Sequence, residues 1–334
     1  MLQDRQLLSP KEKTVSSKVW LLAKWVVTLL ILSYIYTTFQ KEQTGIRNIG
    51  RVLQSVLTSP HRFALTVLVL LVPINWMLES LKWMLLAQKA VKLNFAEAFR
   101  STLTGLAVGV AVPAQLGDTL GRITSLRSSQ RLTALGAALV SNGIQFYVSV
   151  LGGTLSWVLV GSSLRLPYPY GSLIQTLLAV IVLGGLLIGI FRKKLVNWRS
   201  NRLWANKIQE NIRVVNQYTG TDLVVALGLG ATRYLVFVGQ FALALSLFNL
   251  PIPMLDLLSC VGLILLAKTL LPALNIIGDL GLRQFTALLV FESYGLAHEK
   301  IIAATFLIWL INILGPLLVG LFLIWKHQWN TRYA

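Results

Sequence analysis

Two Asp–Arg pairs with the same spacing are the residues in this sequence that could bind an anionic group. Asp118 precedes Arg122 by four positions, and Asp279 precedes Arg283 by four positions. On a helix this spacing puts both side chains of a pair on one face, within reach of an ion pair. An Arg that is held by its Asp still has spare N–H donors for a phosphate. The alternative for the same residues is structural, with each Asp capping a helix and anchoring a buried Arg.

Both pairs lie in short segments where glycines and prolines interrupt an apolar stretch. Residues of these two types weaken or break helices. At membrane depth they are tolerated where protein or a water-filled cavity satisfies the freed backbone groups. The glycine directly before each Asp allows a close approach of backbone, and a helix that starts there presents free N–H groups to an anion. The residues that we expect to form the breaks are Pro113, Gly117, Gly121, Pro272, Gly278 and Gly281.

Four further charged side chains fall within or beside apolar segments and are candidates for the same site. Glu79 and Lys82 are three positions apart and can pair locally, either in the interior or as an interfacial pair beside tryptophans. Arg233 and Lys268 belong to later apolar stretches. A charge at the bilayer centre costs about 2.5–3.5 kcal/mol on insertion scales, and it generally faces the protein interior or water. We therefore expect Arg233 to bind substrate or a buried partner, while Lys268 can also reach a lipid headgroup.

Motifs for catalysis and for metal binding are absent from the sequence. The histidines, His61, His298 and His327, are far apart, and Cys260 is the only cysteine. There is no phosphate-binding P-loop, no HExxH zinc motif and no GxSxG nucleophile motif. Because the histidines form no metal-binding set and these motifs are absent, we expect no metal and no cofactor. Because no nucleophile is paired with a base, we also expect no self-contained hydrolase.

The elements that must position these residues are long hydrophobic segments. Hydrophobic residues make up 55% of the 334 positions and charged residues only 13%, which is about half the charged fraction of a soluble domain. Spanning a bilayer takes about 20 mostly apolar residues, and continuous rather than alternating apolar runs predict helices. The first run has no small-residue cleavage site after it, so we interpret it as a retained transmembrane helix. The long apolar windows are 19–39, 62–88, 131–160, 171–191, 221–248 and 299–326.

The order of these segments indicates an internal duplication. Residues 18–160 and 165–326 each contain a helix, a basic linker, a second helix, a break and a third helix. A chance similarity of two short motifs is the alternative. Each copy crosses the membrane an odd number of times, whether its break is re-entrant or fully spanning, so the two copies must lie in opposite orientations. The predicted fold is an all-α polytopic integral membrane protein of two inverted repeats, each with three long helices and one broken segment.

The distribution of basic residues predicts the orientation of the chain. The formal net charge is +18, but Lys and Arg lie mostly in loops, which is typical of the positive-inside bias and not of a nucleic-acid-binding surface. The loop 192–219 is strongly basic, whereas 161–170 holds one basic residue. Both tails, 1–17 and 327–334, are therefore expected in the cytoplasm. The basic linker 40–62 then falls on the outer side, where it fits an amphipathic helix on the membrane surface.

The layout and the two breaks resemble the flippase-like membrane domain of lysylphosphatidylglycerol synthases, a family that also occurs as stand-alone proteins. The resemblance covers about 18–326 and rests on Pro…Gly-Asp…Gly-Arg at 113–122 and Pro…Gly-Asp-Leu-Gly-Leu-Arg at 272–283. The family usually has Glu where Asp118 and Gln284 stand here. The resemblance implies a lipid-handling protein of the cell membrane. We expect no soluble domain that attaches the amino acid, because little sequence follows the last apolar span.

Three functions are open on these grounds. The resemblance and the charged residues favour a translocator that moves an anionic or aminoacylated phospholipid, or a polyprenyl-phosphate-linked lipid, between leaflets. The alternatives are a non-catalytic membrane partner of a separate enzyme of lipid or glycan synthesis, and a membrane enzyme that modifies a lipid. We expect the partners to be membrane lipids and not nucleic acid. The predicted substrate-binding residues are Asp118, Arg122, Asp279, Arg283, Arg233, Glu79, Lys82 and Lys268.

Overall fold

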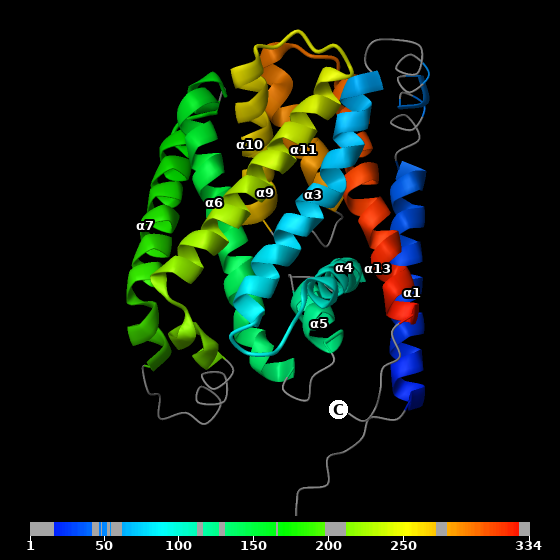
Figure 1. Ribbon diagram of the computed structural model, residues 1–334. Helices are drawn as coiled ribbons and strands as arrows, with labels where there is room; N and C mark the ends of the chain where they lie inside the picture. The colour runs from blue at the N-terminus through cyan, green and yellow to red at the C-terminus, as the bar shows by residue number, and fades with distance from the viewer. Residues whose placement is uncertain are drawn as a thin grey trace, which may run out of the picture.

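The computed structural model describes most of the chain as an elongated helical bundle (Figure 1). The described residues are 17–41, 47, 49–51, 54, 62–111, 116–126, 131–164, 166–197, 212–271 and 279–326. Within these ranges the chain contains no strand, which confirms the all-α prediction. Most of the linker 40–62 and of both tails lies outside the described residues, as do three of the expected break residues, Pro113, Pro272 and Gly278.

The described elements follow the order of the predicted windows. The α-helices are α1 (Ser17–Lys41), α3 (Arg62–Ala87), α4 (Phe95–Ala111), α5 (Leu116–Thr124), α6 (Leu135–Val160), α7 (Tyr170–Asn197), α9 (Gly220–Ser246), α10 (Met254–Leu270), α11 (Asp279–Phe291), α12 (His298–Trp309) and α13 (Gly315–Lys326). A π-helical turn, Leu310–Leu314, joins α12 to α13. Short 3₁₀ turns lie at Arg131–Ala134, Gly161–Ser163, Arg213–Gln217 and Glu292–Tyr294.

Five helical segments of the described chain are long and apolar enough to span a membrane. They are Arg62–Ala87, Leu135–Ser163, Tyr170–Asn197, Gly220–Ser246 and His298–Lys326, and they coincide with five of the six predicted windows. The remaining window falls in α1, where the apolar stretch Lys24–Thr37 is shorter than the other five. The chain is therefore a membrane protein with several transmembrane helices.

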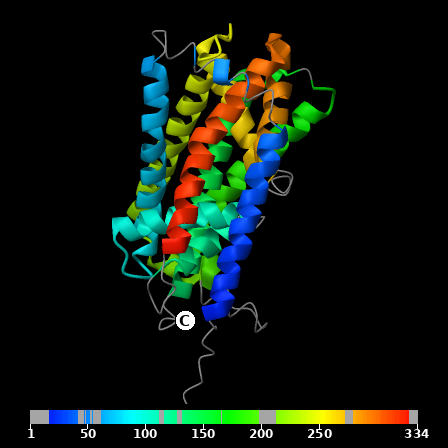
Figure 2. The same ribbon diagram turned by 90° about the vertical axis from the view of Figure 1, so that its right-hand side faces the viewer.

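Each predicted break corresponds to a pair of short helices at one end of the bundle. The helices α4 and α5 pack on each other at the lower end, and α10 and α11 pack on each other at the upper end (Figures 1 and 2). The longest of the four has 17 residues, fewer than the roughly 20 that a span requires. The interruptions lie between α4 and α5 and between α10 and α11, so the helices continue through Gly117, Gly121 and Gly281.

Two of these glycines let α5 pack closely on α4. A Cβ atom on Gly121 would lie 2.8 Å from the Cα atom of Gly105, and one on Gly117 would lie 2.5 Å from the carbonyl oxygen of Val108. A larger residue at either position would push the two helices apart. The predicted close approach of backbone at the glycine before the first Asp is thus confirmed. In α11, a Cβ on Gly281 would have no heavy atom of the described residues within 4 Å.

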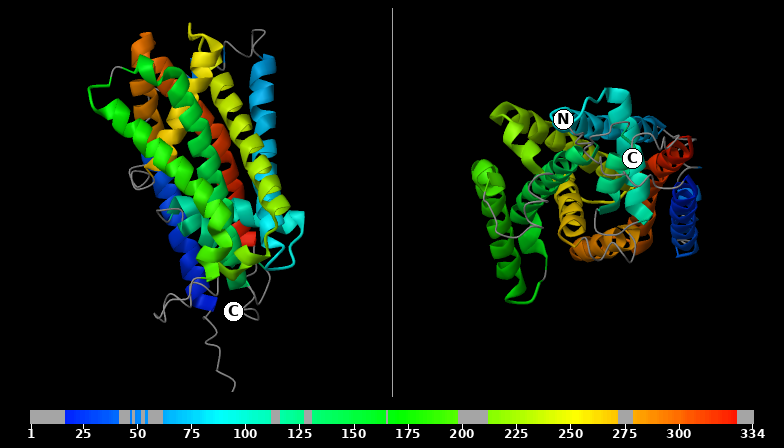
Figure 3. Two further views of the ribbon diagram at one scale, coloured as in Figure 1. Left: turned by 90° about the vertical axis from the view of Figure 1, so that its left-hand side faces the viewer. Right: turned by 90° about the horizontal axis from the view of Figure 1, so that it is seen from below.

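The helices α3 and α9 pack against each other at the centre of the bundle. Both contact α6, and α9 also contacts α12. The helices α1 and α7 lie at opposite edges (Figure 3). In α7 only Leu178 and Val196 are buried, so this helix presents almost its whole apolar surface outward. The centre of the bundle, in contrast, holds buried polar and charged side chains.

Candidate functional site

The carboxylate of Glu79 is the centre of a buried group of ion pairs. Glu79 Oε2 lies 2.8 Å from Lys82 Nζ and 3.2 Å from Arg233 Nη1, and Oε1 lies 3.0 Å from Arg122 Nη2. The three cations come from α3, α9 and α5. Glu79 is 2% exposed, Lys82 0% and Arg122 4%, which favours the interior over the interfacial alternative for the Glu79–Lys82 pair. These residues, with Asp118 described next, are called the Glu79 cluster.

Asp118 supplies the second carboxylate of the cluster. Its Oδ2 lies 2.9 Å from Arg122 Nε, which confirms the ion pair expected from the four-residue spacing. Asn142 of α6 donates hydrogen bonds to Asp118 Oδ2 and to Thr119 Oγ1, both at 3.2 Å. One turn further along α6, Gln145 Oε1 accepts a hydrogen bond from Lys82 Nζ at 3.1 Å. One face of α6 therefore orients both a carboxylate and a cation of the cluster.

Two tryptophans of α3 lie beneath the two arginines of the cluster. Trp76, Glu79 and Trp83 are three and four positions apart and so share one helical face. The Arg233 guanidinium lies 5.5 Å from the ring centroid of Trp76, and that of Arg122 lies 5.7 Å from the centroid of Trp83. A guanidinium over an indole face is attracted by the ring quadrupole. Each arginine is thus held between a carboxylate and an aromatic ring.

The cluster contains more positive charge than negative charge. Lys82, Arg122 and Arg233 face two carboxylates, which leaves an excess of one positive charge. Arg122 Nη1 and Arg233 Nε are buried and donate no hydrogen bond within the part of the chain that the structure describes. A buried donor without an acceptor costs free energy of folding, and the cost is larger when the donor belongs to a charged group, as it does here. The side chains of Asp118 and Arg233 remain 22% and 20% exposed, so the cluster has an accessible side.

A chain of hydrogen bonds links the cluster to the π-helical turn. Trp76 Nε1 donates to the backbone oxygen of Asn312, and Asn75 Nδ2 donates to Asn312 Oδ1, both at 3.3 Å. Asn312 Nδ2 donates to Gln240 Oε1 at 3.0 Å, and Gln240 Nε2 donates to the backbone oxygen of Leu68 at 3.1 Å. A π-helical turn disturbs the regular backbone ladder and often marks a functional position. This network ties α3, α9 and the α12–α13 junction together beside Arg233.

One protein-family profile, described as the lysylphosphatidylglycerol synthase TM region, matches residues 21–320. The chain belongs to this family. The match includes every residue of the Glu79 cluster and all of the short helices at the two ends of the bundle. Family membership indicates a membrane role related to lipids. No curated protein and no solved structure matches the chain.

In this member of the lysylphosphatidylglycerol synthase TM family, the arginine of the second predicted pair, Arg283, contacts α9 one turn away from Arg233 of the Glu79 cluster. Arg283 of α11 is fully buried, and its guanidinium lies 5.4 Å from the ring centroid of Phe237. Phe237 follows Arg233 by four positions, so the two share a face of α9 and are one turn apart. The side chain of Asp279 lies outside the described residues, and its pairing with Arg283 stays a prediction.

The structure does not place Lys268 among the cations that contact Glu79. Lys268 lies in the last turn of α10 and is partly buried. Sequence reasoning also missed the polar partners Asn142, Gln145 and Asn312. Asn142 and Gln145 could have been identified from the sequence, because two polar residues three positions apart in an otherwise apolar window share a helical face.

The chemistry of the site follows from the side chains that form the cluster and its surroundings. Among the described residues no group of three or more His, Cys, Asp or Glu side chains could hold a metal ion. The groups that remain are two guanidinium groups, one ammonium group, two carboxylates and two indoles. Such a set can bind a phosphate or another small anion and release it again.

Proposed function

We propose that this chain moves a lipid with an anionic phosphate headgroup from one leaflet of the membrane to the other. The observation that carries the proposal is the Glu79 cluster, with its excess positive charge and its buried unpaired donors on Arg122 and Arg233. Phosphate oxygens accept several charged hydrogen bonds at once, and arginine binds them in a forked geometry. Charged groups within transmembrane segments commonly mark substrate pathways.

The carboxylates of the cluster keep the cations paired both with and without a bound lipid. A headgroup phosphate takes up the spare N–H groups of Arg122 and Arg233, while Glu79 and Asp118 keep both arginines oriented. When the lipid departs, Lys82, Arg122 and Arg233 each keep a contact with a carboxylate. Release therefore leaves no cation of the cluster without a paired carboxylate, which would cost several kcal/mol. The same balance keeps phosphate binding weak enough for transport.

Inverted repeats would supply the alternating access that translocation requires. Matched contacts support this arrangement, because the last long helix of each half packs on a short helix of the other half. Gly153 of α6 packs closely against Leu266 of α10, and Gly320 of α13 packs closely against Leu103 of α4. The short helices lie at opposite ends of the bundle (Figure 1). Movement of one half against the other about the α3–α9 contact would then open the cluster to either side.

The proposed orientation places 192–219 in the cytoplasm and 161–170 outside the cell membrane. In a Cys260→Ala background, Gln217→Cys is expected to react with a membrane-impermeant maleimide from the cytoplasmic side, and Ser163→Cys from the outer side. Both positions are exposed. Labelling of intact cells and of inverted vesicles measures the side. The Cys260→Ala background itself has no thiol, and reaction of both new cysteines from one side would exclude inverted repeats.

The proposed activity is tested with the purified chain in phosphatidylcholine vesicles that contain a trace of fluorescent phosphatidylglycerol. We expect protein-dependent movement of the probe, measured as the fraction that a membrane-impermeant reductant quenches. Fluorescent phosphatidylcholine, which has no net charge, is expected to move more slowly because the cluster has an excess positive charge. Rates equal to those of protein-free vesicles for both probes would contradict the proposal. Co-purification of a lipid- or glycan-synthesis enzyme with such an inactive chain would favour the non-catalytic partner.

A further inference from the structure

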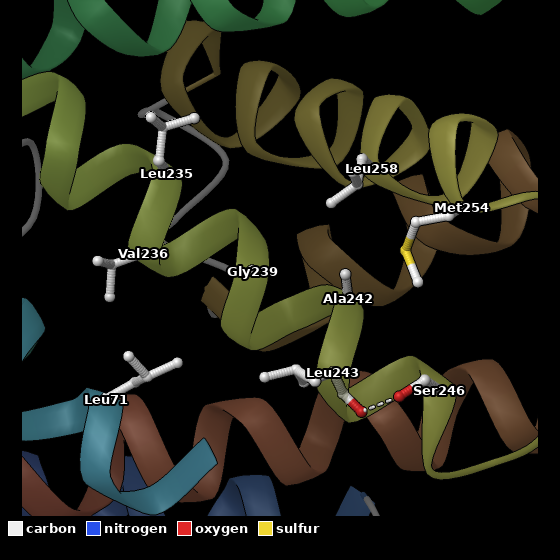
Figure 4. A pocket seen from close by; sticks show the side chains of 9 residues that line it. All are labelled: Leu71, Leu235, Val236, Gly239, Ala242, Leu243, Ser246, Met254 and Leu258. Carbon is white, nitrogen blue, oxygen red and sulfur yellow. Dashed lines mark hydrogen bonds between the residues drawn. The ribbon is translucent and has the colours of Figure 1, made fainter. Parts of the chain in front are cut away.

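An apolar groove opens on the side of the bundle between α3, α9 and α10 (Figure 4). Its volume is about 470 Å³, within the range of about 300–1,000 Å³ that is typical of small-molecule sites. The hydroxyl at its rim, that of Ser246, donates a hydrogen bond to the backbone oxygen of Leu243 in its own helix. The groove therefore offers hydrocarbon contact and no free polar partner. Its walls include Leu71, Leu235, Gly239, Leu243, Met254 and Leu258.

We propose that this groove holds one hydrocarbon chain of the lipid whose phosphate binds the Glu79 cluster, an inference that rests on the proposed function. The two sites share α9, because Val236, which lines the groove, follows Arg233 by three positions and so is its neighbour on the helix surface. Leu235 and Met254 are 66% and 60% exposed at the groove, so a chain can enter it from the surrounding bilayer. A charged site beside an apolar groove is complementary to a lipid with a phosphate headgroup and a hydrocarbon tail.

The length of the groove matches one leaflet of the membrane. Arg233 is the fourteenth of the 27 residues of α9 and so lies near the middle of that helix. From Leu235 to Ser246 the helix rises by about 16 Å, at about 1.5 Å per residue. Half of the hydrocarbon thickness of a bilayer is about 15 Å. The groove thus runs from the middle of the bundle to its upper end, where α9 ends and α10 begins (Figure 1).

This geometry assigns a direction to the bound lipid. The cluster includes Asp118 and Arg122 of α5, which lies at the lower end of the bundle (Figure 1). A lipid from the lower leaflet has its headgroup below and its tail pointing up. When its phosphate reaches Arg233, its tail fills the upper half of the bundle, where the groove lies. The groove thereby holds the tail in hydrocarbon-like surroundings while the headgroup crosses the middle of the membrane.

Photo-crosslinking tests the groove directly. The probe is a phosphatidylglycerol with a diazirine in its acyl chain, reconstituted with the full chain in phosphatidylcholine vesicles. We expect crosslinks in the peptide that contains Met254 and Leu258, and competition by unlabelled phosphatidylglycerol but not by diacylglycerol. Crosslinks that diacylglycerol competes equally well would identify ordinary bilayer lipid and overturn the proposal.

Matched substitutions in α9 separate the groove from the charged site. Gly239→Leu fills the groove and is expected to reduce the crosslink at least fivefold, whereas Gly228→Leu, at an exposed and equally open position, is expected to leave it unchanged. Leu235→Trp at the mouth of the groove, with Val224→Trp as its control, repeats the test at positions 66% and 68% exposed.

The same experiment distinguishes failure of the groove from failure of the proposed function. Unchanged crosslinking in both Gly239→Leu and Leu235→Trp, with lipid movement still lost in Arg233→Gln, would exclude the groove and leave the translocator intact. Equal lipid movement in Arg233→Gln and in the unsubstituted chain would contradict the charged site itself, and the groove proposal would fall with it. Loss of the crosslink in the two groove variants alone supports the assignment.

Discussion

Glu79→Gln is expected to lower the free energy of unfolding by about 3–5 kcal/mol, the usual cost of breaking a buried ion pair from one side. Glu79 contacts Lys82, Arg122 and Arg233 at 2.8–3.2 Å and is 2% exposed. Without its charge, Lys82 and Arg233 lose the carboxylate that contacts them, and Arg122 keeps that of Asp118. Thermal unfolding of the detergent-solubilised protein measures the loss as a lower melting temperature.

A second substitution tests whether charge imbalance is the cause. Glu79→Gln combined with Lys82→Gln removes one charge of each sign, and we expect the double variant to be more stable than Glu79→Gln alone. Such non-additivity is typical of residues in one network. Glu299→Gln is the matched control, because Glu299 is exposed in the first turn of α12, where a charge contributes only about 0.3–1 kcal/mol. Equal melting temperatures for Glu79→Gln and Glu299→Gln would contradict the central role of Glu79.

Arg122→Lys is expected to reduce the rate of lipid movement at least about tenfold while the charge is kept. Arg122 Nε binds Asp118 at 2.9 Å and Nη2 binds Glu79 at 3.0 Å, which leaves Nη1 free for a phosphate. A lysine has a single compact charge and cannot reproduce this fork. Loss of one hydrogen bond to a charged group costs about 1.5–3 kcal/mol, and about 1.4 kcal/mol corresponds to a factor of ten. The initial rate of phosphatidylglycerol movement, normalised to reconstituted protein, measures the effect.

Arg100→Lys provides the control for this substitution. Arg100 lies on α4 and is exposed, so the same chemical change is expected to leave the rate unchanged. Melting temperatures of the two variants show whether Arg122→Lys is still folded. A folded Arg122→Lys protein with an undiminished rate would remove Arg122 from the binding site.

The local parts of the site could be predicted from the sequence, because helical pitch determines which near neighbours meet. The spacings of four and three residues predicted the Asp118–Arg122 and Glu79–Lys82 pairs, and both pairs form. The apolar windows predicted five described spans, because the thickness of the bilayer sets the length of a transmembrane helix. The roles of these residues in lipid binding stay predictions.

Contacts between distant parts of the chain could not be predicted in the same way. Arg233 was expected to need a partner, but 154 positions separate it from Glu79, and spacing gives no information over such a distance. Asn312 likewise joins distant segments, because it lies 237 positions from Asn75 of α3 and 72 positions from Gln240 of α9. The role of Gly121 also depended on packing, since it lies where α5 closely approaches Gly105 of α4.

The sequence by itself determined that this protein is a helical membrane protein and that two acid–base pairs form within single helices. Those properties depend on hydrophobicity, length and helical pitch, which act over a few turns. Only the tertiary structure decided that one carboxylate, that of Glu79, forms ion pairs with cations from three helices. In a dry interior a charge must find its counter-charge wherever the packing of the helices brings one close, and that packing is a property of the whole bundle.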